Sequence, residues 1–422
     1  MMLNRILGRL FNRWPSGVPH LYPGLDARTL AAFMTEQEFL RIRSFDCVYI
    51  LPFADSDSSG QDLAFGLGLS HLMIRNLMLL TDLSIRGPED TPKILRDNVV
   101  ELSIQREAVF VTGTATRSQN RYQLDFDVQH RGASIGGDAI DSRSWPQFLK
   151  QTSESIARSI GSRGAISVNG GWDSGQAETD MVLEQYGALA MAFSQKETML
   201  RTNAAIQMMQ KYADFALPAW LIDNEAKAAL KWNLEGLRRD PLNAQICFEL
   251  FCALSHITCL DPAGVQFCRK AIELSPGHGK SHMCAPHRAP RSVNMLNHSE
   301  LGYRLLAGNP FAINNYILNL KKHKAPPERL LEFAKEGIRS DPEDPGNYMR
   351  MIELLSDMKE WQAALDVANS LLQLYHPVMS ERALYCLRQV PQIAAMLDAG
   401  TFDPVSQATN TVAQLTKKVR SP

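Results

Sequence analysis

The chain has 422 residues, of which 45% are hydrophobic and 21% charged, as in a folded protein large enough for two or three domains. Its 44 basic and 45 acidic side chains leave a net charge of -1, so no overall field favours binding to nucleic acid. No apolar run approaches the roughly 18 residues that cross a bilayer. The seven cysteines follow no secreted disulfide pattern. These features predict a cytoplasmic protein without direct nucleic-acid contact.

Residues 1–45 read as a leader that begins with a short amphipathic helix. In residues 1–14 the apolar side chains would share one helix face, while Arg5, Arg9 and Arg13 would gather on the other. Such a helix suits peripheral contact with an anionic membrane surface. Docking on the protein itself or on a partner is the favoured interpretation, and membrane contact is the alternative.

Residues 46–162 alternate short strand patterns with helical patterns, which predicts a small α/β domain. Strands are expected at residues 47–51, 83–86, 108–115 and 122–128, with the last two forming a hairpin. Helices are expected at residues 63–80, 94–104 and 145–160. The stretch 163–180 is rich in glycine and serine and predicts a flexible linker.

From residue 181 onward, helical patterns follow one another and proline recurs at a regular interval. The dipeptides are spaced by 35, 34, 32 and 35 residues, and they are Asp240-Pro241, Ser275-Pro276, Asn309-Pro310, Asp341-Pro342 and His376-Pro377. Each proline would end a helix. A small residue five places earlier (Gly236, Ala271 and Gly337) would let two helices approach closely. The pattern predicts helix pairs over 181–400 that bury their apolar faces on their neighbours, with a C-terminal tail at 401–422.

This pattern resembles the tetratricopeptide repeat, a helix–turn–helix unit of roughly 34 residues. The resemblance implies an α+β chain in which a small α/β domain precedes an all-α solenoid. It also implies a protein or peptide partner, bound without a cofactor in a groove lined by the first helix of each pair. The residues expected to face that groove are Glu249, His256, Met349, Glu353 and Asp357.

The N-terminal domain resembles the TolB N-terminal-like module that precedes such repeats in bacterial signalling proteins. The matching segments are Ile50-Leu51-Pro52-Phe53, Ala64-Phe65-Gly66-Leu67, Leu83-Ser84-Ile85-Arg86-Gly87 and Val109-Phe110-Val111-Thr112-Gly113-Thr114. Adenylate cyclase-like proteins and CadC-like or HilA-like regulators carry an output domain before this module. Only about 45 residues precede it here, so the resemblance implies an accessory or assembly module without an output domain.

One repeat departs from the pattern and contains several candidate metal ligands. His278, His282, Cys284 and His287 lie close together in sequence, and imidazole and thiolate groups bind zinc. Their spacing matches no closed zinc site, so a polar turn between repeats is the favoured interpretation and no metal is expected. Pro286 and Pro290 predict that the first helix of this repeat is broken.

Three functions follow from these patterns. The first is an interaction or assembly module in bacterial signalling or regulation. The second is an accessory protein that regulates transcription through a partner. The third is an enzyme with an unrecognised site in the α/β domain, although Ser70 and His71 fall inside an apolar helix and are better suited to a core than to catalysis. The sequence identifies neither the partner nor the oligomeric state.

Overall fold

The chain divides into two compact units, Met1–Ala289 and Pro290–Pro422. The computed structural model describes residues 47–55, 64–86, 108–118, 121–161, 176–192, 198–223, 228–256, 261–285, 293–306, 309–376, 378–388, 393, 396–397 and 399–420. The predicted leader at 1–45, the predicted helix at 94–104 and His287 lie outside these residues. Among the described helices, none combines the length and the apolar composition needed to cross a membrane.

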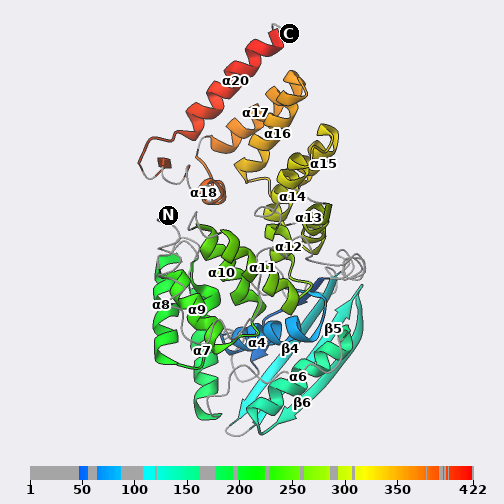
Figure 1. The fold of residues 1–422 in the computed structure, drawn as a ribbon, viewed down its shortest axis with the longest axis vertical. Helices are drawn as coiled ribbons and strands as arrows, with labels where there is room; N and C mark the ends of the chain where they lie inside the picture. Colours follow the sequence, from blue (N-terminus) through cyan, green and yellow to red (C-terminus); the bar gives the residue numbers. More distant parts are fainter. Residues whose placement is uncertain are drawn as a thin grey trace. The chain divides into compact units, whose positions relative to one another are not determined.

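The first unit contains a mixed sheet near the N-terminus (Figure 1), as the sequence predicts. Its strands follow the order β3-β1-β4-β5-β6, and β2 (Ala54–Asp55) pairs with β4. Their bounds are β1 (Cys47–Ile50), β3 (Ser84–Arg86), β4 (Ala108–Ser118), β5 (Arg121–His130) and β6 (Ala133–Ser142). β1 runs parallel to β3 and β4, whereas β4, β5 and β6 are antiparallel neighbours. The result is an α/β core with an antiparallel extension.

Strand β6 is absent from the prediction. Its sequence, ASIGGDAIDS, combines glycine, alanine, serine and aspartate, which are uncommon in strands. The strand forms because β5 offers it a regular ladder that runs from Tyr122–Ser142 to Val128–Gly136. Tertiary pairing therefore overrides the local propensity of this segment.

Helix α4 (Ala64–Leu80) lies at the centre of the first unit, and each of its 17 residues is buried. A helix that is apolar on all sides needs cover on all sides. Helix α6 (Trp145–Ile160) packs against α4 and across β5 and β6, and α7 (Gln176–Ala192) packs against another side of α4. Glycine permits the closest approach, since a Cβ on Gly187 would lie 1.7 Å from the carbonyl oxygen of Ala64.

The helices after α7 share this core. They are α8 (Thr198–Lys211), the 3₁₀ turn η5 (Leu217–Leu221), α9 (Ala229–Arg239), α10 (Ala244–His256), α11 (Asp261–Leu274) and the short α12 (Gly279–Cys284). One hydrophobic cluster extends from Val48 of β1 to Ala285 after α12. The structure divides between Ala289 and Pro290, whereas the sequence predicts a division at 163–180. The reason is that α7 packs on α4, so the helices that follow α7 share one hydrophobic core with the sheet.

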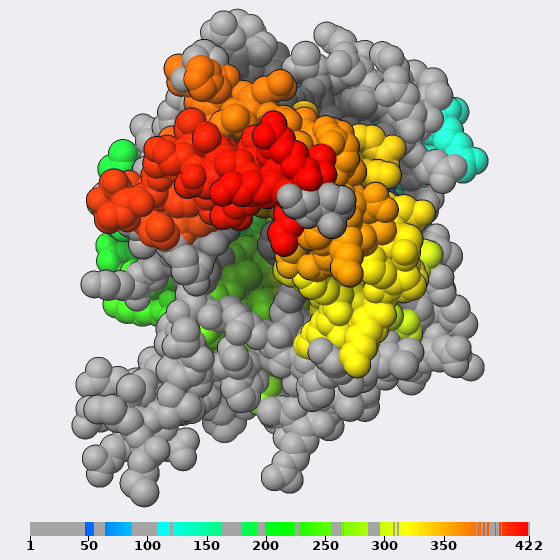
Figure 2. Space-filling model, turned by 90° about the horizontal axis from the view of Figure 1, so that it is seen from above, coloured from blue at the N-terminus to red at the C-terminus, as the bar shows by residue number. Residues whose placement is uncertain are grey.

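The second unit is helical throughout its described residues. Its helices are α13 (Val293–Leu305), α14 (Pro310–Lys322), α15 (Pro327–Ser340), α16 (Pro345–Asp357), α17 (Trp361–Tyr375), α18 (Glu381–Arg388) and α20 (Pro404–Arg420). The segment 401–422, predicted to be a tail, instead contains α20, which packs on α17 through Ala408 and Leu415. Figure 2 shows α20 in red against the orange helices that precede it.

Candidate interaction surface

The turns that follow three of the five repeat prolines, Pro241, Pro276 and Pro342, share one local geometry. Two residues after the proline, a side chain caps the next helix by accepting a hydrogen bond from a backbone N–H. Asn243 caps α10 by accepting from Ile246 at 3.1 Å, and Asp344 caps α16 by accepting from Gly346 at 2.8 Å. His278 stands at the same position before α12, where its Nδ1 accepts the N–H of Ser281 at 3.3 Å. In these three turns the proline is followed by a capping residue and then by the first helix of a pair, whereas Pro310 is itself the first residue of α14.

The small residues before each proline lie where helices cross. Ala271 is fully buried in α11. A Cβ on Gly236 would lie 2.8 Å from the Cβ of Ala219, and one on Gly337 would lie 2.9 Å from Oδ1 of Asn347. Contacts this short show that larger side chains would push the helices apart.

In the second unit, first helices of neighbouring pairs contact each other through their side chains. Nζ of Lys321 in α14 lies 2.5 Å from Oε1 of Glu353 in α16 and 3.8 Å from Oδ2 of Asp357. Nε of Arg350 in α16 donates to Oδ1 of Asn314 in α14 at 3.0 Å. The hydrogen-bonded pairs are separated by 32 and 36 residues, which is about one repeat. Helices α14 and α16 therefore lie side by side although α15 separates them in sequence.

Contacts about one repeat apart also occur between second helices and within the first unit. Tyr303 of α13 donates its hydroxyl hydrogen to Glu336 of α15 at 2.7 Å, across 33 residues. In the first unit, Nε2 of His278 lies 3.0 Å from Oε1 of Gln245 in α10, again 33 residues away. Equivalent helices are thus neighbours at more than one place in the chain.

The paired first helices of the second unit expose a mixed surface. Helix α14 contributes Leu318, which is 42% exposed, beside Lys321. Helix α16 contributes Met349, which is half-buried, with Glu353 and Asp357 on the same face at intervals of four residues. We call Asn314, Leu318, Lys321, Met349, Arg350, Glu353 and Asp357 the α14–α16 face. It combines apolar side chains with charged groups of both signs.

Hydrogen bonding and burial shift the pKa values of the cations on this face in opposite directions. The hydrogen bond to Glu353 raises the pKa of Lys321 above its usual value. Burial lowers the pKa of Arg350, and the nearby carboxylates of Glu353 and Asp344 offset part of that effect. Arg350 is thus a partly desolvated cation held in place by a single hydrogen bond to Asn314.

The residues predicted to face a groove fall into two groups. Met349, Glu353 and Asp357 meet on α16, and the latter two share Lys321. Glu249 belongs to α10 of the first unit, is half-buried and accepts a hydrogen bond from Gln245. His256 ends α10, but its side chain lies outside the described residues. Lys321 and Leu318 are absent from the prediction, although subtracting one repeat from Glu353 points to this part of α14.

The histidines of the broken repeat have structural roles. Nδ1 of His278 lies 2.7 Å from Oγ of Ser281, and Nε2 of His282 lies 2.7 Å from the carbonyl oxygen of Pro276. Burial lowers the pKa of His278 to about 3 and that of His282 to about 4, so both rings are neutral near pH 7. Cys284 is buried nearby, and His287 lies outside the described residues. Their ring nitrogens serve the turn and are not gathered around one point.

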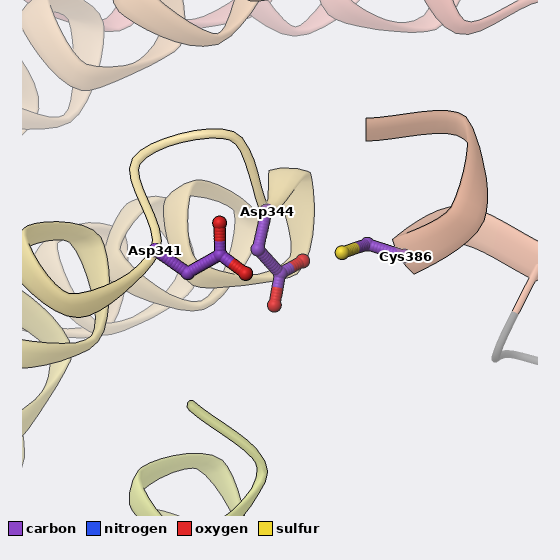
Figure 3. Close-up of side chains that lie close together, drawn as sticks. All are labelled: Asp341, Asp344 and Cys386. Atoms are coloured by element: carbon purple, nitrogen blue, oxygen red, sulfur yellow. The ribbon is translucent and has the colours of Figure 1, made fainter. Parts of the chain in front are cut away.

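A different group brings metal-ligand atoms together in the second unit. One ligand atom from each of Asp341, Asp344 and Cys386 lies within 4.8 Å of the others, and Figure 3 shows Cys386 of α18 facing the Asp344 carboxylate. Both carboxylates already accept backbone hydrogen bonds, Asp341 from Glu343 at 3.3 Å and Asp344 from Gly346 at 2.8 Å. A closed zinc site needs a fourth ligand. Asp341 and Asp344 belong to the turn before α16, and Cys386 reaches them from α18.

Ser70 and His71 of α4 bond to groups in the core of the first unit. Oγ of Ser70 donates to Leu51 and Gly66, while Nδ1 of His71 lies 2.7 Å from the hydroxyl of Tyr186. Both side chains are buried in α4, as the sequence predicts. A cavity of about 10 Å³ lies beside Arg75 and Asp240, and this volume is suited to one water molecule.

Comparison with known proteins leaves the family open. No protein-family model matches the chain. No curated protein matches it either. The similarity to tetratricopeptide repeats therefore depends on the residues and contacts described above.

Proposed function

We propose that the helical region is a tetratricopeptide-type array and that the chain is an interaction or assembly module. In this proposal the α14–α16 face binds an extended or helical segment of a partner protein. The observation that supports it best is the pair of contacts between α14 and α16, Lys321–Glu353 and Arg350–Asn314, at a spacing of about one repeat. Side-by-side first helices form the kind of continuous surface on which a peptide can lie.

The composition of the face fits this role. Leu318 and Met349 offer apolar contact area, and methionine adapts its shape to different ligands. Lys321, Glu353 and Asp357 add charge beyond them on the same helices, and their side chains are 45%, 56% and 62% exposed. An apolar centre with a polar rim is the usual anatomy of a protein interface.

The test compares the partners captured by three forms of the full chain from extracts of its native host, with identification by mass spectrometry. Two forms are the wild type and the double variant Leu318→Glu/Met349→Glu, which places charge at the apolar centre. The third is Glu332→Lys, because Glu332 is exposed on the second helix α15. We expect the double variant to lose a partner that Glu332→Lys retains, while both keep the melting temperature of the wild type within a few degrees. Identical partner sets for all three forms would contradict the proposal.

A further inference from the structure

Strand β6 forms the outer edge of the sheet in the first unit. It pairs with β5 on one side, and no strand among the described residues pairs with its other side. Its ten residues span roughly 33 Å at the usual rise of a strand. An edge of this length presents a row of backbone N–H and C=O groups that another strand can use.

β6 lacks two of the features that usually protect an edge strand. It contains neither proline nor lysine, and Ile135 is 47% exposed. A bulge interrupts the first part of β6, because Val128 pairs with Gly136 and Gln129 with Ser134, which leaves Ile135 as the extra residue. From Gly136 to Ser142 the register is unbroken. This second part is regularly paired, and most of its residues are exposed.

The charge of the edge favours a basic partner. β6 carries Asp138 and Asp141 and no cation. The Asp138 carboxylate accepts the N–H of Ala139 at 3.0 Å and the hydroxyl of Ser155 at 2.7 Å, which keeps negative charge beside the strand backbone. Asp141 is shared with Arg121 of β5 at 2.6 Å. A second copy of β6 would bring like charges together, which is unfavourable between neighbouring strands.

We propose that the free edge of β6 binds a basic, extended segment of a partner protein by strand addition. The partner's backbone would pair with residues 136–142, and its lysine or arginine side chains would lie beside Asp138 and Asp141. The inference depends only on the sheet of the first unit. It adds a second binding mode that is independent of the α14–α16 face.

The sheet supplies a matched pair of variants for the test. Asp125 of β5 is paired with Thr114 of β4 on one side and with Ala139 of β6 on the other. Ala139→Lys and Thr114→Lys therefore place the same charge beside the same carboxylate at exposed positions. Only Ala139→Lys changes the edge strand. Asp138→Asn provides a second edge variant that removes charge without adding bulk.

The probe is a fluorescently labelled eight-residue peptide of valine and threonine with two lysines three positions apart, so that the lysines lie on opposite faces of the added strand, as Asp138 and Asp141 do in β6. Its binding to the full chain is followed by anisotropy. A control peptide replaces valine and threonine with proline, which cannot join a sheet. We expect Ala139→Lys and Asp138→Asn to weaken binding about threefold or more, Thr114→Lys to weaken it less, and the proline peptide to bind poorly. Leu318→Glu/Met349→Glu should leave peptide binding unchanged, which separates this site from the proposed groove.

Three results would overturn the inference. Equal affinity of the two peptides would show plain charge attraction. Equal affinity of Ala139→Lys, Thr114→Lys and the wild type would place any binding away from the edge. Sedimentation showing a dimer that Ala139→Lys converts to a monomer would mean that a second copy of the chain occupies β6.

Discussion

The ion pair between Arg75 and Asp240 shows how single residues join the sheet layer to the repeats. Nε and Nη2 of Arg75 in α4 donate to the two carboxylate oxygens of Asp240 at 2.9 and 2.5 Å, and the side chains are 4% and 6% exposed. Asn243 also donates to Asp240 at 2.9 Å. Removal of one partner would leave the other charge buried without compensation, which is more costly than the pair is favourable.

We therefore predict that Asp240→Asn lowers the free energy of unfolding by about 3 kcal/mol or more. The exposed Asp214→Asn supplies the control and should change it by less than about 0.5 kcal/mol. Urea denaturation followed by circular dichroism measures both. Equal midpoints for the two variants would mean that the buried pair does not hold these layers together.

His278 predicts a pH dependence of stability. Its folded pKa, about 3, lies below the ordinary value of 6.5, so the unfolded chain binds more protons between these limits. Stability is therefore complete above pH 6.5 and is lost as the pH falls towards 3, by up to about 1.4 kcal/mol per pH unit. His282 acts in the same direction, with a folded pKa of about 4.

The variant His278→Asn should flatten part of this dependence. Asparagine keeps the capping role, as Asn243 shows at the equivalent position, but it does not titrate. Chemical denaturation at pH 7 and pH 5 should give a smaller loss of stability for the variant than for the wild type. The same loss in both proteins would show that His278 already accepts a proton in the folded state.

At the scale of elements, the crossing of α4 and α7 defines the first unit. The Cβ built on Gly187 would lie 1.7 Å from the carbonyl oxygen of Ala64, and one on Gly68 would lie 2.6 Å from that of Leu183. The atoms that such a Cβ would meet belong to the backbone, so no change of side-chain rotamer could relieve the overlap. The two helices therefore touch through their main chains, and any side chain at these positions must separate them.

We predict that Gly187→Leu destabilises the protein by several kcal/mol, whereas the neighbouring Ala188→Leu is nearly neutral because Ala188 is exposed. Thermal unfolding of the two variants measures the difference. If the melting temperatures agree, α7 does not pack on α4 in solution.

The elements with strong periodicity could be predicted from the sequence, and those shaped by tertiary contacts could not. Helix α6 has the predicted bounds, since its apolar residues recur at helical spacing from Trp145 to Ile160. The glycine-containing β6 and the polar α20 have weak local signals. They form because β5 and α17 provide partners for them. Pairing with a distant segment cannot be predicted from the residues of a short stretch of sequence alone.

At the scale of the whole molecule, the division into units differs from the division of the sequence patterns. The sequence pattern changes from alternating strands and helices to helices alone at 163–180. In the structure, however, Tyr186 of α7 is buried against His71 of α4. The first helices of the helical region therefore belong to the same core as the sheet. The next change comes after Ala289, a few residues beyond the end of α12 at Cys284. Amino-acid composition predicts where a linker is expected. The extent of a core depends instead on which apolar helix and sheet faces are buried against one another.

The candidate face was only partly predictable for a related reason. The resemblance to tetratricopeptide repeats predicted Met349, Glu353 and Asp357 for one surface, and they follow one another at intervals of four residues in α16. The predicted set did not include Lys321, because the charge that meets Glu353 comes from a helix 32 residues earlier. Residues one repeat apart can be predicted to contact each other only when equivalent helices are known to lie side by side.

The stacking of equivalent first helices is tested most directly by a double-mutant cycle at Lys321 and Glu353. Lys321→Glu and Glu353→Lys are made alone and together, and stability is measured by urea denaturation at low salt. If α14 and α16 lie side by side, each single variant brings like charges together and the double variant restores an opposite pair, with a coupling energy of about 0.5 to 1 kcal/mol. Strictly additive effects of the two substitutions would contradict the stacked arrangement on which the proposed function depends.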